Sequence, residues 1–173
     1  PLTAVTNGSI DMGSTEIIGA SERALADLRG RYVGTVFQNP AHALNPVMTV
    51  GAQIMEVLKI HHPEQSTAQL EARVDEMMEL VGIPAKRKVE YPHQFSGGMK
   101  QRIVIAIALA CEPKLILADE PTGNLDSTNG AEVMELLREL NGQGTTIVMV
   151  THSERDASFA HRIIYLLDGR VVS

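Results

Sequence analysis

The sequence predicts an α/β fold in which helices flank a parallel sheet, with a more helical insert over about residues 50–95. Three apolar segments, at residues 32–37, 115–118 and 145–151, have the composition of buried strands. Helical segments of ten or more residues separate them, which is typical of parallel βαβ units with right-handed crossovers. At 173 residues, with 44% hydrophobic and 21% charged residues, the chain has the size and composition of one globular domain.

The N-terminal part predicts small hairpin strands followed by a short helix. Turn residues at positions 7–8 and 13–14 separate short apolar pieces, as in small hairpins. Ser21 is placed to cap a helix over residues 22–28, and Gly30 is placed to stop it.

The next strand is expected to be buried and to end at a polar residue. It covers residues 32–37 and is followed by Gln38. The pairs Asn39-Pro40 and Asn45-Pro46 are then expected to interrupt regular structure, because proline restricts its own backbone and that of the residue before it.

The helical insert is expected to contain two amphipathic helices. The first covers residues 50–60, and the second begins at Ser66 with a capping box and ends at Gly82. Met77 and Met78 lie on the apolar stripe of this helix, so we interpret them as packing residues and not as metal ligands.

The C-terminal part alternates between helices and strands. The pattern predicts a helix over 97–111, a strand over 115–118, a helix over about 130–140, a strand over 145–151, a short helix after Ser153, and strands at 162–167 and 171–172 around a turn at 168–169.

Composition excludes several classes of protein. The longest apolar runs are far shorter than the roughly 20 residues that cross a bilayer. The net charge of −6 argues against a general nucleic-acid binder, which needs basic surface to neutralise phosphates. The single cysteine, Cys111, is expected to be a small buried hydrophobe in a reducing, cytosolic compartment. The N-terminus shows no secretory signal and resembles the middle of a longer protein.

Two adjacent carboxylates follow the apolar strand at residues 115–118. Asp119 and Glu120 would lie at the carboxyl end of a parallel strand, the edge at which ligands bind in open α/β sheets. An aspartate there can hold Mg²⁺, and the following glutamate can orient and deprotonate a water molecule. An ordinary acidic loop is the alternative for this motif alone.

A Ser-Gly-Gly sequence opens the preceding helix. Ser96 is a good helix N-cap, and Gly97 and Gly98 expose backbone N–H groups at the positive end of the helix dipole. This arrangement suits a phosphate group, although a plain glycine-rich helix start is the alternative.

Together these motifs resemble those of the ATP-binding subunits of ABC transporters. Residues 96–101 resemble the signature motif, 115–120 Walker B, 121–126 the D-loop, Gln38 the Q-loop and Thr151-His152 the H-loop. The resemblance covers residues 1–173 and implies a P-loop NTPase-type parallel sheet with a helical subdomain.

The resemblance implies a role for each matching residue near the hydrolysed phosphate. Gln38 would contact Mg²⁺ or the attacking water and sense the transmembrane partner. Asp119 would support Mg²⁺, and Glu120 would be the general base. His152 would contact the γ-phosphate and stabilise charge in the transition state.

The resemblance also implies that ATP binds between two such subunits. Asp126 would link the two nucleotide sites, and the signature residues Ser96, Gly97, Gly98, Met99, Lys100 and Gln101 would serve the nucleotide of the partner. The implied partners are a second ATP-binding subunit and transmembrane permease subunits. The implied location is cytoplasmic, at the inner face of the membrane.

One element of the family pattern is missing from the sequence. The phosphate-binding loop, G-x-x-x-x-G-K-S/T, requires a Gly-Lys pair, and no such pair occurs in this chain. We therefore expect a partial domain whose N-terminal strands and phosphate loop are absent. Such a chain should hydrolyse ATP negligibly by itself, and its sheet should have unpaired edges and exposed apolar surface.

The two halves of the chain resemble different transporter classes. Residues 37–51 and 91–99 resemble the dipeptide, oligopeptide and nickel importer ATPases, whereas residues 121–127 and 145–152 resemble lipoprotein-release and macrolide-export ATPases. Since the region after Gln38 contacts the permease in this family, peptide or nickel import is favoured and export is the alternative.

Two further alternatives remain open at this stage. An ABC ATPase of DNA repair would share these motifs but would usually carry coiled-coil or zinc insertions, which the sequence lacks. The second alternative is a noncatalytic partner that supplies only the signature face to a complete subunit.

Overall fold

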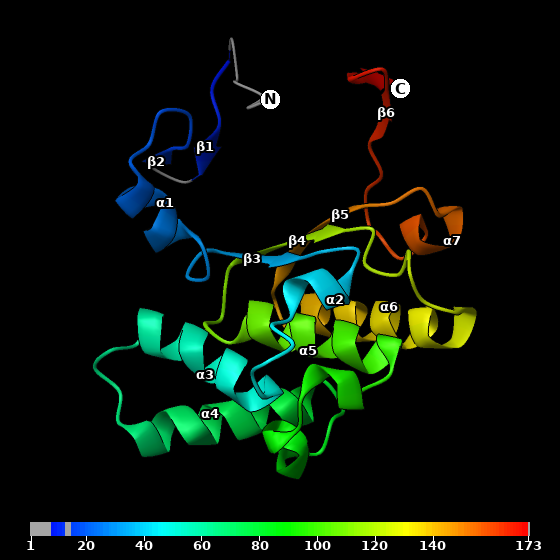
Figure 1. Ribbon diagram of the computed structural model, residues 1–173. Helices are drawn as coiled ribbons and strands as arrows, with labels where there is room; N and C mark the ends of the chain where they lie inside the picture. Colours follow the sequence, from blue (N-terminus) through cyan, green and yellow to red (C-terminus); the bar gives the residue numbers. More distant parts are fainter. Residues whose placement is uncertain (1–7, 13–14, 173) are drawn as a thin grey trace.

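A three-stranded parallel sheet forms the centre of the protein. The computed structural model describes residues 8–12 and 15–172, and its central strands are β3 (Val33–Val36), β4 (Leu115–Asp119) and β5 (Thr146–Val150). Their spatial order is β3-β4-β5, with Gly34 opposite Ile116 and Ile116 opposite Ile147. The predicted α/β fold with a parallel sheet flanked by helices is therefore confirmed (Figure 1).

The N-terminal elements form as predicted within the described residues. Strands β1 (Asp11–Met12) and β2 (Thr15–Glu16) pair antiparallel, and α1 (Glu22–Leu28) is capped by the side chain of Ser21. Gly30 follows the helix with a φ of 82°, a left-handed backbone that favours glycine. Residues 7, 13 and 14 of the predicted turns lie outside the described residues.

All the elements between β3 and β4 are helical. They are α2 (Pro40–Ala43), α3 (Val50–His61), α4 (Thr67–Leu80), the 3-10 helices η1 (Ala85–Val89) and η2 (Pro92–Gln94), and α5 (Gly97–Leu109). Regular structure is interrupted at Asn39 and at Asn45-Pro46 as expected, but the short helix α2 was not expected: it begins at Pro40 because the Asn39 side chain accepts a hydrogen bond from Ala41 N–H and proline fits the first helical position. The capping box at Ser66 is confirmed.

The C-terminal elements extend the predicted alternation. They are α6 (Ser127–Gly142), β5, α7 (Glu154–Ala157), capped by Ser153, and the antiparallel pair β6 (Tyr165–Leu167) and β7 (Arg170–Val172). Helix α6 begins three residues before the predicted start at 130. The reason is Asp126, whose carboxylate accepts the N–H groups of Thr128 and Asn129 and so caps the helix earlier.

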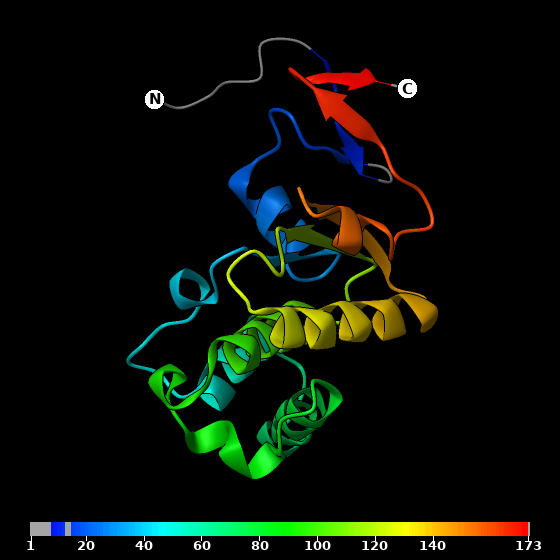
Figure 2. The same cartoon turned by 90° about the vertical axis from the view of Figure 1, so that its right-hand side faces the viewer.

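One face of the sheet packs on α5 and α6, with α3 and α4 further from it (Figures 1 and 2). Alternate strand residues point into this layer, as period-two side-chain direction requires. The predicted packing role of Met77 and Met78 and the buried position of Cys111 are confirmed. The core includes Val36, Ile54, Met77, Met78, Ile103, Ile116 and Val133.

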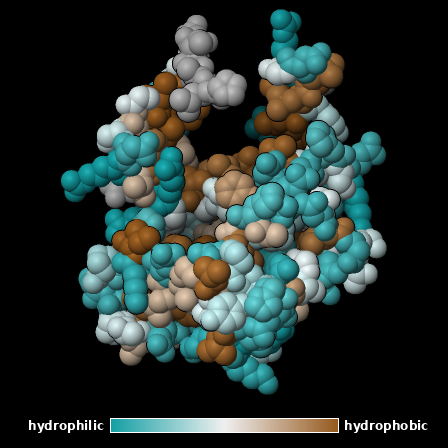
Figure 3. Space-filling view, viewed as in Figure 1, coloured by the Kyte–Doolittle hydropathy of each residue, from teal (hydrophilic) through white to brown (hydrophobic). Residues whose placement is uncertain are grey.

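The opposite face of the sheet is open to solvent. Leu117, Val148 and Val150 point toward it and are 40%, 51% and 57% exposed. Hydrophobic surface lines the hollow between the N-terminal segment and the C-terminal arm (Figure 3). The expected exposure of apolar sheet surface is therefore confirmed for this face. Within the described part of the chain, no helix is both long and apolar enough to span a membrane.

Candidate functional site

Gln38 and Asp119 lie at the carboxyl edge of the parallel sheet, Gln38 two residues after β3 and Asp119 at the end of β4. Both line a pocket of about 350 Å³, together with Phe37, Asn39, His42 and Ala43. Ligands bind at this edge in open α/β sheets because adjacent parallel strands end there together. The pocket thus brings together the two residues predicted to hold Mg²⁺, and their carboxylate and amide oxygens are the donor type that this cation prefers.

Glu120 follows Asp119 in a left-handed backbone conformation, with a φ of 44°. Its Oε1 accepts the N–H of His152 at 2.7 Å, and its Oε2 accepts the hydroxyl of Thr151 at 3.2 Å. The side chain is 16% exposed, whereas that of His152 is 98% exposed. Two donors therefore fix the orientation of the Glu120 carboxylate, and the His152 imidazole is exposed at the surface beside it.

The His152 ring lies beside the same carboxylate. Its Nε2 is 3.7 Å from Glu120 Oε1, too long for a good hydrogen bond but within the range of an ion pair when the ring is protonated. The structure therefore brings together Glu120 and His152, which belong to two separate motifs of the sequence.

Two side-chain amides hold the backbone around Gln38. Gln101 Nε2 donates to the carbonyl of Phe37, and Asn124 Nδ2 donates to the carbonyl of Gln38, each at 3.0 Å. Gly123 also lies against Gln38, since a Cβ on Gly123 would lie 2.9 Å from its Nε2. The segment after β3 is therefore tied to α5 and to the loop after β4.

Gln101 differs from the expectation that it contacts a nucleotide. Its side chain is fully buried, and its Oε1 has no hydrogen-bond partner among the described residues. A nucleotide cannot reach it in this conformation. Gln101 acts instead on the position of Phe37, and through it on Gln38.

The start of α5 is exposed and well defined. The Ser96 hydroxyl accepts the N–H of Met99 at 3.3 Å, so Ser96 is the N-cap that its sequence predicts. Ser96 and Gly97 are exposed, and Met99 and Lys100 are partly exposed. The first N–H groups of a helix have no partner within it and, together with the dipole, favour an anion.

Gly98 is buried against α6. A Cβ added there would lie 2.1 Å from Asn129 Oδ1, so no larger residue fits without displacing Asn129. A Cβ added to Gly97 would lie 3.7 Å from Leu125 Cδ2, so Gly97 is close to Leu125. The second glycine of the motif therefore permits close packing of α5 on α6, while the first leaves the helix start open.

Asp126 lies at the start of α6, next to these glycines. The N–H and then the side-chain amide of Asn129, followed by the N–H of Thr128, hold the pKa of its carboxyl below the ordinary value of 3.8. In this chain its carboxylate is used as a helix cap. Its expected role between two nucleotide sites remains a prediction.

Four residues near these groups were not identified from the sequence as site residues. Asn124 and Thr151 lie inside motifs that the sequence showed, and each forms a hydrogen bond to a site residue that only the fold reveals. His42 lines the pocket and Asn129 packs on Gly98, and no sequence signal marked either.

Comparison with known proteins gives one consistent result. Residues 2–123 match the family described as ABC transporter. The oligopeptide transport ATP-binding protein OppD of Bacillus subtilis is 43% identical over 169 residues, covering 95% of this chain and 47% of OppD. OppD of Mycobacterium tuberculosis is 41% identical (99% of this chain, 29% of OppD), and the dipeptide transport ATP-binding protein DppD of Haemophilus influenzae is 43% identical (97% and 52%). The chain spans about half or less of the length of these curated relatives.

Solved structures agree with the sequence comparison. The ATP-binding cassette MJ0796, solved as a dimer in a post-hydrolysis state with ADP and Pi, has a TM-score of 0.85 at 35% identity, covering 98% of this chain and 73% of that one. The cbiO1 protein of Clostridium perfringens, part of the cbiONQ transporter complex, has a TM-score of 0.77 at 30% identity, covering 88% and 60%.

Proposed function

This chain belongs to the ABC transporter family of ATP-binding proteins, and from that premise we propose that it is part of a subunit that couples ATP binding and hydrolysis to peptide import. The observation that carries the proposal is the pairing of Glu120 with His152 beside the Gln38–Asp119 pocket. The names of the relatives favour dipeptide and oligopeptide uptake over nickel uptake, lipoprotein release or macrolide export.

The chemistry that the chain's own residues provide is orientation and proton transfer. Glu120 accepts a proton from water. Hydrogen bonds from the His152 N–H and the Thr151 hydroxyl hold its carboxylate in a fixed orientation. The exposed His152 ring donates to a phosphate oxygen as charge develops there. Asp119 and Gln38 would hold Mg²⁺, which when bound neutralises charge on the phosphates.

The start of α5 is proposed to serve the nucleotide of a second ATP-binding subunit. Ser96 and Gly97 are exposed at the positive end of a 13-residue helix, as an anion site requires. They are followed by Lys100, whose charge adds to the attraction for phosphate. ATP is then the shared substrate of two subunits that form a homodimer or a heterodimer.

Three exposed apolar residues on adjoining segments support a further partner, a permease segment at the inner face of the membrane. We define the docking patch as Val47, Val89 and Tyr91, which are 78%, 67% and 41% exposed. The N–H of Val50 donates to the carbonyl of Glu90 at 2.9 Å, which brings the segment after Gln38 beside η1. Exposed apolar surface of this kind marks protein interaction sites.

The experiment that tests the proposal uses a partner cassette that has a complete G-x-x-x-x-G-K-S/T loop but an inactivated signature motif. Adding this chain should restore MgATP turnover by the partner. Ser96→Asp should lower the restored turnover by at least roughly tenfold, because aspartate retains the helix cap but repels phosphate. Ser66→Asp is the matched control, since it adds the same charge at the cap of α4.

Equal restoration by the Ser96→Asp and Ser66→Asp chains would contradict the proposed signature face. No restoration by the unaltered chain, at concentrations where the two proteins associate, would contradict the proposed function as a whole.

A further inference from the structure

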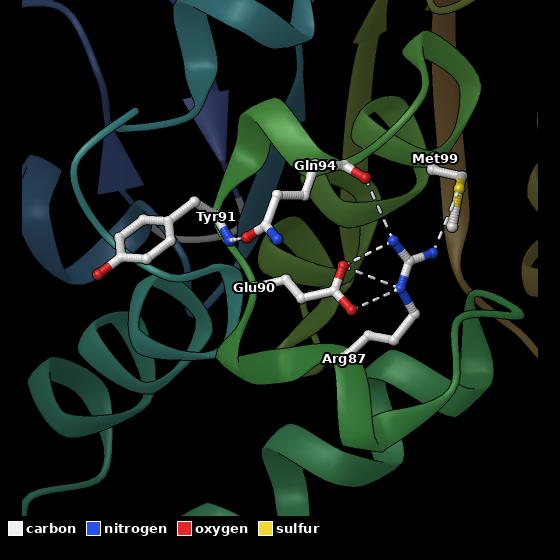
Figure 4. A network of polar contacts seen from close by, with 5 residues as sticks. All are labelled: Arg87, Glu90, Tyr91, Gln94 and Met99. Atoms are coloured by element: carbon white, nitrogen blue, oxygen red, sulfur yellow. Dashed lines mark hydrogen bonds and ion pairs between the residues drawn. The ribbon is translucent and has the colours of Figure 1, made fainter.

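Arg87 occupies a position between the docking patch and the start of α5. It belongs to η1, two residues before the exposed Val89, and its own side chain is only 26% exposed. Figure 4 shows the guanidinium pointing toward Glu90, Gln94 and Met99, and the last two flank Ser96 in sequence. No sequence pattern singles out this arginine, because a single 3-10 turn has no hydrophobic period to interpret.

A bidentate ion pair fixes the guanidinium plane. Arg87 Nε lies 3.0 Å from both carboxylate oxygens of Glu90, and Nη2 lies 2.6 Å from Oε2. This pairing lowers the pKa of the Glu90 carboxyl and raises the pKa of Arg87. Paired in this way, the guanidinium has a defined orientation and N–H groups left over for other acceptors.

The remaining groups contact three residues around Ser96. Nη2 donates to the carbonyl of Gln94 at 3.2 Å, Nη1 lies 3.7 Å from the sulfur of Met99, and the guanidinium carbon lies 4.3 Å above the ring centroid of Phe95. Phe95 is 4% exposed, so this cation–π contact is largely shielded from water. One side chain therefore contacts the residues on both sides of the N-cap.

The same segment is held to the backbone of the docking patch. The Gln94 side chain accepts the N–H of Tyr91 at 2.8 Å, and the carbonyl of Glu90 accepts the N–H of Val50. A displacement of η1 by a partner would therefore move Arg87, and with it the three residues that its guanidinium contacts. No other route from the patch to α5 is needed for this coupling.

We propose that Arg87 is a positioning residue that couples partner docking on η1 to the placement of Ser96 and Gly97. This inference rests on the proposed function, in which a permease binds the docking patch and a nucleotide binds the start of α5. The inference adds that Arg87 couples these two surfaces. The planar, forked guanidinium of Arg87 is essential to this coupling. A lysine keeps the charge and the ion pair with Glu90 but cannot contact Gln94, Phe95 and Met99 together.

The test compares Arg87→Lys with Arg87→Ala and with the control Arg138→Lys. Arg138 forms a bidentate pair with Glu135 three residues before it on α6 and contacts none of the site residues, so it matches the chemistry without the position. The first readout is amide hydrogen exchange of residues 96–100 in the chain alone. Arg87→Lys should speed this exchange at least about fivefold while thermal stability stays near that of the unaltered chain, and Arg138→Lys should not.

The second readout is the maximal MgATP turnover restored to the signature-inactivated partner cassette. Arg87→Lys should lower this maximum at least about fivefold and leave the chain concentration for half restoration within about twofold. An arginine that only stabilised the fold would lower thermal stability in Arg87→Lys, without a selective change in exchange at residues 96–100. Unchanged exchange and unchanged turnover in Arg87→Lys would overturn the inference. If the unaltered chain restores no turnover, the proposed function fails, and the exchange measurement alone still decides whether Arg87 positions α5.

Discussion

At the scale of single residues, the site depends on side chains whose polar groups are already occupied by neighbours. Glu120 receives hydrogen bonds from two residues of the loop after β5, and the backbone at Gln38 receives hydrogen bonds through Gln101 and Asn124. Such partners preorganise a site because little rearrangement is left for the moment of reaction. They also make the position of each functional group depend on more than one element.

The lowered pKa of Asp126 predicts how the stability of the protein depends on pH. Because its folded pKa is below 3.8, the protonated form is disfavoured in the folded state, and its contribution to stability is present above the unfolded pKa. That contribution is lost as the pH falls through the folded pKa. In Asp126→Ser, which keeps an uncharged cap, the difference in unfolding free energy from the unaltered chain should therefore shrink between about pH 5 and about pH 2.

Urea unfolding at several pH values measures this difference. The carboxyl groups of Glu16, Glu90 and Glu135 also have lowered pKa values, and since they are present in both proteins their contributions cancel. A difference that stays constant across the pH range would contradict the capping role of the Asp126 charge.

The sequence predicted which elements carry the candidate site residues better than it predicted the contacts of these residues. Asp119, Glu120 and His152 stand in motifs whose order along the chain indicates one site, and the fold brings Glu120 and His152 together. Gln101 was placed on the nucleotide because it lies in the same motif, yet four residues beyond Gly97, the first residue of α5, it is fully buried in the core. Sequence position fixes the element, whereas only packing fixes which face of it a residue occupies.

At the scale of elements, the contact between β3 and α5 places the pocket residues next to the signature helix. Gly34 permits this contact, because a Cβ there would lie 2.5 Å from the carbonyl oxygen of Ala108. The oxygen belongs to the backbone of α5 and cannot move without moving the helix. The strand therefore needs glycine for close approach, which explains a residue that otherwise weakens strands.

Gly34→Ala should accordingly destabilise the protein by about 1–3 kcal/mol through overpacking. The matched control is Gly142→Ala at the end of α6, where a Cβ would meet no atom within 4 Å. Since alanine is the better helix former, this control should leave stability unchanged or raise it by up to about 1 kcal/mol. Urea denaturation of both variants measures the two effects, and a Gly34→Ala protein as stable as the parent would contradict this packing.

Helix starts show why some element boundaries were predictable and others were not. Ser21, Ser66, Ser96 and Ser153 all cap helices where the sequence placed them. Asn39 and Asp126 are also caps, but each precedes residues that are equally typical of turns. The prediction failed there because the same side-chain hydrogen bond starts a turn or a helix, and tertiary packing decides between them.

At the scale of the whole molecule, the residues that the structure describes cover one face of the sheet with helices and leave the other face open. The covered face packs on α5 and α6, and the open face presents Leu117, Val148 and Val150. Apolar surface of this kind drives association in water. The sequence predicted the open surface from a missing motif, and the fold shows which residues form it.

The purified chain should therefore associate as its concentration rises. Replacing both Val148 and Val150 by lysine should shift sedimentation velocity toward the monomer, because charges on a sheet face oppose its burial. Ile60→Lys is the control, since Ile60 is 67% exposed on α3, away from the sheet. A clean monomer of the unaltered chain at all concentrations would contradict this prediction.

We propose that this chain carries the hydrolytic and signature residues of an ABC cassette, while its 173 residues do not include the loop that cradles the phosphates. Binding and steady-state turnover of MgATP by the purified chain alone, beside Glu120→Gln, test it most directly. The account predicts negligible turnover in both proteins, because no Gly-Lys pair is present to hold the β- and γ-phosphates. Turnover by the unaltered chain that disappears in Glu120→Gln would contradict the account, since other residues of this chain would then have to bind the phosphates.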